Sequence, residues 1–173
     1  MIFAVVLCLS AIDPAPLPPV LRGIDQLPSR ALVETAATRD LLAVALDDNV
    51  KVVHRARAIR LLGARPDVDP GLSVASALVT LRASPIPELR VHAALAQGAR
   101  AARQGQGLPF AAGLLHDEDV ELRRAALTLL WIDRSAAARD VVFAHGRSEL
   151  DPALQELVRH RLQQWSASSK RRR

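Results

Sequence analysis

The sequence predicts an all-α fold, a short α-solenoid of about four stacked helical pairs. Half of the 173 residues are apolar and only 3% are aromatic, which favours closely packed helices over twisted sheets. One pattern recurs at intervals of 36 and 33 residues. A repeat of that length is typical of helical pairs that bury their apolar faces against neighbouring pairs.

Three segments carry the pattern: a polar residue, an apolar residue five positions later, a basic residue next, and then small residues. The polar residues are Asp48, Ser84 and Asp117, and we expect each to be a helix N-cap. Pro85 would then occupy the first helical position. The apolar and basic pairs that follow are Val53 with His54, Leu89 with Arg90, and Leu122 with Arg123.

The third segment predicts its helix most clearly. An apolar stripe with helical spacing runs along one face, formed by Leu122, Ala125, Ala126, Leu129 and Leu130. A fourth, divergent copy appears when Leu154 is set against Leu122. There Asp151 and Pro152 are the better helix start, and Gln155 replaces the arginine.

Each of these helices needs a partner that precedes it. We expect the partners at residues 29–46, 70–82, 109–115 and 135–144, with interior loops at 63–70 and 103–107. The repeat domain is then 29–165, preceded by a proline-rich linker at 13–28. Residues 166–173 are expected to form a mobile basic tail.

The run from Asp119 to Leu127 resembles the second helix of a HEAT repeat, with its acidic lead-in, its apolar-arginine pair and its double alanine. Residues 48–62 and 84–97 resemble it less closely. The resemblance implies a right-handed superhelix whose second helices line a concave surface. It also implies a fold that serves mostly as an interaction scaffold.

The recurring basic position has two interpretations. It could grip a phosphate or an acidic peptide, or, as the HEAT resemblance implies, each arginine could pair with an acidic residue of a neighbouring repeat, here Asp48, Asp117 or Glu149. We favour the pairing. The binding residues that we expect on the concave face are Arg55, Arg90, Arg123, Arg124 and Arg159.

The sequence predicts no metal site, no cofactor and no catalytic group. None of its five histidines belongs to a His-x-x-x-His or His-Glu pair, whereas HEAT-type deoxyhypusine hydroxylases bind iron through repeated His-Glu pairs. His116 beside Asp117 is the nearest approach to a catalytic dyad. The position of Asp117 at a helix start explains that aspartate as a cap.

Trp131, Asp133 and Arg134 invite comparison with HEAT-like DNA glycosylases, which hold DNA with such residues. Trp131 aligns with Gly98 one repeat earlier, so we expect its indole to fill the space that a glycine leaves between helices. We expect Trp165 to cover the end of the core. The chain also lacks tyrosine and a basic body, two features of nucleic-acid binders.

The two ends of the chain differ in character. The apolar run of residues 1–12 reads as a secretory signal segment or as a cap on the first helix, and the layout favours export. It is too short to span a bilayer. Cys8 is the single cysteine, so no disulfide can form within the chain. Lys170, Arg171, Arg172 and Arg173 carry four of the five net positive charges and would attract phosphate-rich polymers with little selectivity.

These observations predict a bacterial, non-catalytic scaffold that binds a protein partner with an acidic segment. The alternative is a HEAT-like enzyme or nucleic-acid binder that uses the concave face near Trp131.

Overall fold

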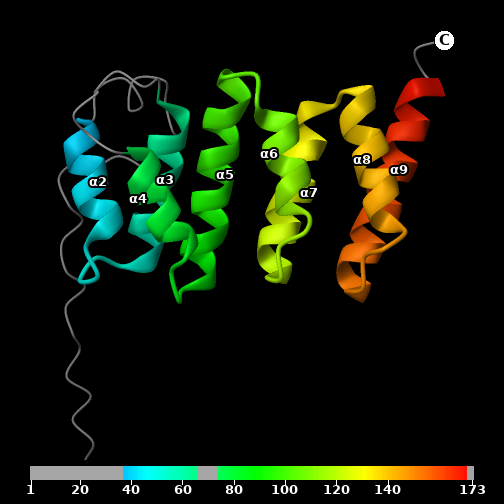
Figure 1. Cartoon of the computed structure of the whole chain (residues 1–173). Coiled ribbons are helices and arrows are strands. Elements are labelled where there is room, and N and C mark those ends of the chain that lie inside the picture. Colours follow the sequence, from blue (N-terminus) through cyan, green and yellow to red (C-terminus); the bar gives the residue numbers. More distant parts are fainter. Residues whose placement is uncertain (1–36, 66–73, 171–173) are drawn as a thin grey trace, which may run out of the picture.

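The computed structural model of the chain describes residues 37–65 and 74–170, which form eight helices and no strand. Figure 1 shows the helices side by side in a row, from α2 at one end to α9 at the other. The all-α prediction is confirmed for these residues. The expected N-terminal segment and proline-rich linker lie outside them. The helices are α2 (Thr38–Leu46), α3 (Val52–Ala64), α4 (Val74–Arg82), α5 (Pro87–Arg103), α6 (Gly107–Leu114), α7 (Val120–Asp133), α8 (Ala136–Gly146) and α9 (Pro152–Lys170).

Contacts between helices follow the order of the chain. Each of α2, α4, α6 and α8 packs on the helix that follows it, and we call these the first helices. The second helices α3, α5, α7 and α9 also contact one another in that order. Apolar side chains form two buried clusters, and α5 contributes to both, with Leu89 and Ala93 in one and Ala94 in the other. The core therefore runs along the whole row.

Within the described residues each expected first-helix segment contains a helix, and only the flanking residues Ala37, Leu115 and Ser135 lie outside it. The N-terminal parts of two of these segments, residues 29–36 and 70–73, lie outside the described residues. Helix α8 begins after Ser135, whose hydroxyl accepts a hydrogen bond from the amide of Ala138 at 3.0 Å. Helix α9 begins at Pro152, and Asp151 accepts from the amide of Leu154 at 2.9 Å. The predicted start at Asp151 and Pro152 is therefore confirmed.

The expected N-caps of the other second helices were wrong. Helices α3, α5 and α7 begin three residues or more after Asp48, Ser84 and Asp117, and Pro87 instead of Pro85 is the first residue of α5. Ser84 and Asp117 lie in the connecting loops, where each accepts a hydrogen bond from the amide two residues later. The chain turns at these loops. Serine and aspartate stabilise turns as well as helix starts, so the sequence pattern does not distinguish the two roles.

The alignment of the first repeat is also off by one residue. The second helices begin 35, 33 and 32 residues apart, so Arg55, not His54, occupies the place of Arg90 and Arg123. Val53 was matched with two buried leucines, yet it is 44% exposed. Its apolar character suggested a core position, because a valine at an exposed helix position looks the same in a sequence as one in the core.

Two glycines at equivalent places let second helices approach closely. A Cβ on Gly63 of α3 would lie 2.6 Å from the Cα of Ala96 in α5, and one on Gly98 of α5 would lie 2.4 Å from Leu129 in α7. Both glycines are buried. Gly98 thus leaves no free space for an indole. Trp131, one repeat later, lies in its own interface between α7 and α9, where it contacts Trp165.

The loop expected at residues 103–107 is present but shorter, at residues 104–106, because Arg103 ends α5 and Gly107 begins α6. Helix α5 ends in a Schellman turn in which the amide of Gln106 donates to the carbonyl of Ala101 at 2.7 Å, and that of Gly105 to Ala102 at 3.1 Å. Gly105 has φ +73°, a conformation that glycine adopts without steric cost.

Helix α9 continues through Lys170, so residues 166–170 of the expected tail are helical, while Arg171, Arg172 and Arg173 lie outside the described residues. None of the helices described is both long enough and apolar enough to cross a membrane.

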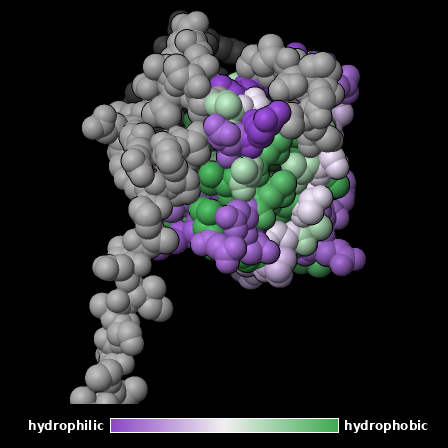
Figure 2. Space-filling view, turned by 90° about the vertical axis from the view of Figure 1, so that its left-hand side faces the viewer, coloured by the Kyte–Doolittle hydropathy of each residue, from purple (hydrophilic) through white to green (hydrophobic). Residues whose placement is uncertain are grey.

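Hydrophobic residues gather on the end of the molecule that includes α2. Figure 2 shows them there, with hydrophilic residues around them. Leu46 of α2 and Val79 of α4 are 47% and 55% exposed. Within the described residues, helix neighbours lie on one side of α2 only, which leaves part of an apolar face open.

Candidate functional site

The predicted binding residue Arg55 is buried and committed to its own repeat. Its Nε donates to the carbonyl of Ala45 at 3.1 Å and its Nη1 to Oδ1 of Asp48 at 2.6 Å. Ala45 lies in the last turn of α2, where carbonyls have no partner within the helix. The guanidinium therefore joins the end of α2 to the start of α3.

Arg90 joins two successive repeats. Its Nε donates to Oδ2 of Asp119, the N-cap of α7, at 2.6 Å, and its Nη1 to the carbonyls of Ser84 and Pro85. One side chain in the first turn of α5 thus holds its own loop and the loop of the next repeat.

Arg123 repeats this arrangement one pair further on. Its Nε and Nη2 donate to the two carboxylate oxygens of Glu149 at 3.0 and 2.9 Å, and its Nη1 to the carbonyls of Asp117 and Glu118. Gln155 occupies the equivalent place in α9 and donates to the carbonyl of Glu149 at 2.6 Å. We call the Arg90–Asp119 and Arg123–Glu149 contacts the loop-bridging ion pairs.

Glu149 is the most enclosed carboxylate of these pairs, with a side chain that is 1% exposed. Besides Arg123, it accepts from the amides of Leu150 and Asp151 and contacts Nε2 of His145 at 2.8 Å. The hydrogen bond with Arg123 is the largest cause that lowers the pKa of Glu149 to about 2, although burial opposes it. The group stays ionised, as its partners require.

The pKa of Asp119 is lowered as well. Burial by itself would raise it, but hydrogen bonds from the amide of Glu121 and from Arg90 outweigh that effect. Both carboxylates are thus held in the charged form that the arginines need.

The remaining predicted arginines lie on the surface. The side chain of Arg124 is 48% exposed and lies 3.6 Å from Glu121 on the same helix. Arg159 of α9 is 62% exposed and pairs with Glu156. The five predicted arginines therefore do not form one site: Arg55, Arg90 and Arg123 hold the fold together, whereas Arg124 and Arg159 face solvent.

The predicted aromatic position is also engaged inside the protein. The ring centroids of Trp131 and Trp165 lie 4.7 Å apart, and the guanidinium carbon of Arg161 lies 4.4 Å from the Trp131 ring. Trp165 packs against the core, in line with its expected role. Asp133 accepts from the amide of Ser135, and Arg134 ends α7 in a left-handed conformation. Trp131, Asp133 and Arg134 thus serve helix packing and a helix end.

The histidines bring no metal site together. Among residues 37–65 and 74–166, no three His, Cys, Asp or Glu side chains cluster in a way that could hold an ion. His54 and His92 each have a buried Nδ1 without a hydrogen-bond partner in that part of the chain. Burial is the main cause that lowers the pKa of His92, and Arg60 adds to it, so the ring tends to be neutral.

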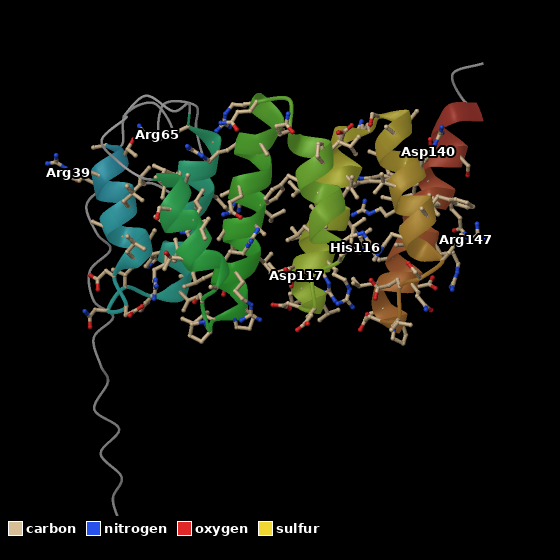
Figure 3. The ribbon with its side chains drawn as sticks, in the orientation of Figure 1. Arg39, Arg65, His116, Asp117, Asp140 and Arg147 are labelled. Atoms are coloured by element: carbon tan, nitrogen blue, oxygen red, sulfur yellow. The ribbon has the colours of Figure 1, made fainter. Side chains whose placement is uncertain are left out.

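His116 and Asp117 do not form the dyad that their adjacency suggested. Figure 3 shows both at the end of α6. Oδ1 of Asp117 accepts from the amide of Asp119 at 3.0 Å, and no hydrogen bond joins the two side chains in the described structure. Asp117 therefore stabilises the turn before α7, and Asp119, two residues later, is the N-cap of that helix.

An open groove at this place was missed in the sequence. It has a volume of about 390 Å³ and lies between the end of α4 and α6, with Arg82, Phe110, Gly113 and His116 among its lining residues. Arg82 and Phe110 are 28 positions apart and belong to different repeats. No periodic pattern connects them, and only the packing of both α4 and α6 on α5 brings them together.

Comparison of the chain with models of known protein families, with characterised proteins and with solved structures gave no match.

Proposed function

We propose that the protein is a non-catalytic scaffold of the HEAT type, a right-handed α-solenoid that binds a partner protein along a concave surface lined by α3, α5, α7 and α9. The observation that carries the proposal is the pair of loop-bridging ion pairs, Arg90 with Asp119 and Arg123 with Glu149. The HEAT resemblance implies contacts of this kind between neighbouring repeats.

Rigidity is what these pairs contribute to such a function. Each joins the first turn of one second helix to the loop before the next, at distances of 2.6 to 3.0 Å. A stack fixed in this way presents its surface with little loss of conformational entropy on binding. Arg124 and Arg159, each beside a glutamate, are exposed on that stack and would favour a partner of complementary charge.

Site-specific photo-crosslinking tests the proposal. A photoreactive amino acid would replace Arg124 or Ile132 on the second helix α7, and the full-length protein would be irradiated in an extract of its source organism. Control variants carry the same group at Arg39 of α2 and Asp140 of α8, both exposed on first helices (Figure 3). We expect one protein partner to crosslink selectively from the α7 positions. No crosslink, or equal crosslinking from the control positions, would contradict the proposal.

A salt titration separates the scaffold from a nucleic-acid binder that uses the surface near Trp131. Binding to duplex DNA would be measured for the full chain and for a full-length variant with serine at positions 170–173. A scaffold should bind weakly and lose that binding with the four basic residues, because the contact is electrostatic and nonspecific. Saturable binding that survives in the serine variant would instead support the nucleic-acid alternative.

A further inference from the structure

The groove between α4 and α6 has the dimensions of a binding site. Its volume of about 390 Å³ falls in the range of pockets that hold small ligands or single side chains of a partner. It is open to solvent and lies at the end of α6 that carries His116 and Asp117 (Figure 3).

One wall of the groove is apolar. Helix α6 contributes Pro109, Phe110 and Leu114 to it. Gly113, on the same helix, keeps the space open, because a Cβ built there would meet no atom within 4 Å. An apolar side chain could therefore enter and lie against the ring of Phe110.

The opposite wall carries the guanidinium of Arg82. Arg82 donates from Nη1 to the neutral amide oxygen of Gln97 at 3.3 Å, and within residues 37–65 and 74–166 it has no carboxylate partner. Its guanidinium keeps donors for a further acceptor, since arginine has five N–H groups. The exposed residue His116 also lines the groove.

Asp117 also lines the groove and brings one negative charge to it. One of its oxygens already accepts from the amide of Asp119. Its charge also acts on Arg123, whose pKa is raised chiefly by the hydrogen bond with Glu149 and further by Asp151 and Asp117. Among residues 37–65 and 74–166 no hydrogen bond or ion pair joins Asp117 to Arg82, so the N–H donors of Arg82 that Gln97 does not use are left for an outside acceptor.

We propose that this groove binds an acidic side chain of a partner protein together with an apolar side chain next to it. Arg82 would hold the carboxylate through charge-assisted hydrogen bonds, and Phe110 with Pro109 would cover the apolar neighbour. The inference rests on the proposed scaffold function for the nature of its partner, but it concerns the first helices rather than the surface of the second helices.

Peptides of defined sequence test the groove directly. The probes are fluorescent ten-residue Gly/Ser peptides with Glu-Leu or Glu-Phe at the centre, and matched peptides with Gln in place of Glu. Fluorescence anisotropy with the full-length protein should show saturable binding of the acidic peptides. Replacing Glu by Gln should weaken it about tenfold, which corresponds to one charge-assisted hydrogen bond.

Variants locate the binding. Gly113→Leu should fill the groove without strain and reduce the affinity at least about tenfold, and Arg82→Gln should remove the preference for Glu over Gln. Ala137→Leu, an exposed change on α8 outside the groove, is the matched control and should bind like the unaltered protein. Circular dichroism would verify that each variant keeps its helical signal, and Arg82→Gln decides the matter should Gly113→Leu fail to fold.

Three outcomes would overturn the inference: no binding of any acidic peptide, equal binding of the Glu and Gln peptides, or unchanged binding by Gly113→Leu and Arg82→Gln. Any of them leaves the crosslinking from Arg124 and Ile132 untouched. Conversely, crosslinks absent at α7 with peptide binding intact would reject the concave-surface function and keep the groove.

Discussion

Arg123 and Glu149 are 26 residues apart in the chain, yet two hydrogen bonds of 3.0 and 2.9 Å join the guanidinium to the carboxylate. The arginine side chain is 17% exposed and that of the glutamate 1%. A charge pair so enclosed is costly to break, because the remaining partner stays buried without its counter-charge.

Stability should fall with acid in the range where Glu149 titrates. The pKa of Glu149 is about 2 in the fold, against 4.5 for an ordinary glutamate. Between these values the unfolded chain binds the proton more readily, so the contribution is complete above pH 4.5 and is lost as the pH falls toward 2. Its size is on the order of 3 kcal/mol. Urea unfolding at a series of pH values measures it.

The matched variant for this prediction is Glu149→Gln. It should be less stable at pH 7 by about 3 kcal/mol, and its stability should change less than that of the unaltered protein between pH 5 and pH 2.5. Identical pH slopes for the two proteins would show that Glu149 is not the group responsible.

The neighbouring arginines of α7 should behave differently. Arg123→Ala removes both bonds to Glu149 and two bonds to loop carbonyls, and should cost about 3 kcal/mol. Arg124→Ala removes only an exposed contact of 3.6 Å and should change stability by less than about 0.5 kcal/mol. Thermal unfolding of the two variants tests this, and equal losses would refute the division of roles.

Two glycine-to-alanine changes should have opposite effects. Gly63→Ala places its methyl group 2.6 Å from the backbone of Ala96, which forces α3 and α5 apart and should cost about 2 kcal/mol. Gly113→Ala meets no atom within 4 Å and should raise stability by about 0.5 kcal/mol through helix propensity. A stable Gly63→Ala protein would mean that the two helices do not approach so closely.

A charge in the stripe of α7 tests the core. Ala126 is 0% exposed, so Ala126→Asp would bury a charge without a partner and should unfold at least the last two helical pairs. Ala137→Asp, in the first turn of α8, should be neutral because it is exposed and lies near a helix N-terminus. Far-ultraviolet circular dichroism would report both, and an unchanged signal for Ala126→Asp would contradict the packing of α7.

The arginine contacts show which part of the ion pairing could be predicted from the sequence. Pairing of the arginines with acidic residues was the favoured prediction, and Arg123 does pair with Glu149 as expected. Arg90 pairs with Asp119 instead of Asp117, and Arg55 pairs within its own repeat. The residue types were predictable, whereas the partners depend on how each loop folds before its second helix.

The candidate groove illustrates the opposite case. Nothing in the sequence around Arg82 or Phe110 marks either as part of a site, since each has the character of an ordinary helix residue. Their common surface exists only because α4 and α6 both pack on α5.

The sequence by itself determined the helical character of the chain, the starts of α8 and α9 at Ser135 and Asp151, and the buried stripe of α7. Helix formation and amphipathic spacing are local properties of the chain. The tertiary structure alone decided the register of the first repeat, the partners of Arg55 and Arg90, and the groove at Arg82. These depend on how closely helices approach at Gly63 and Gly98 and on how each loop turns, and both are set by packing between residues distant in the chain.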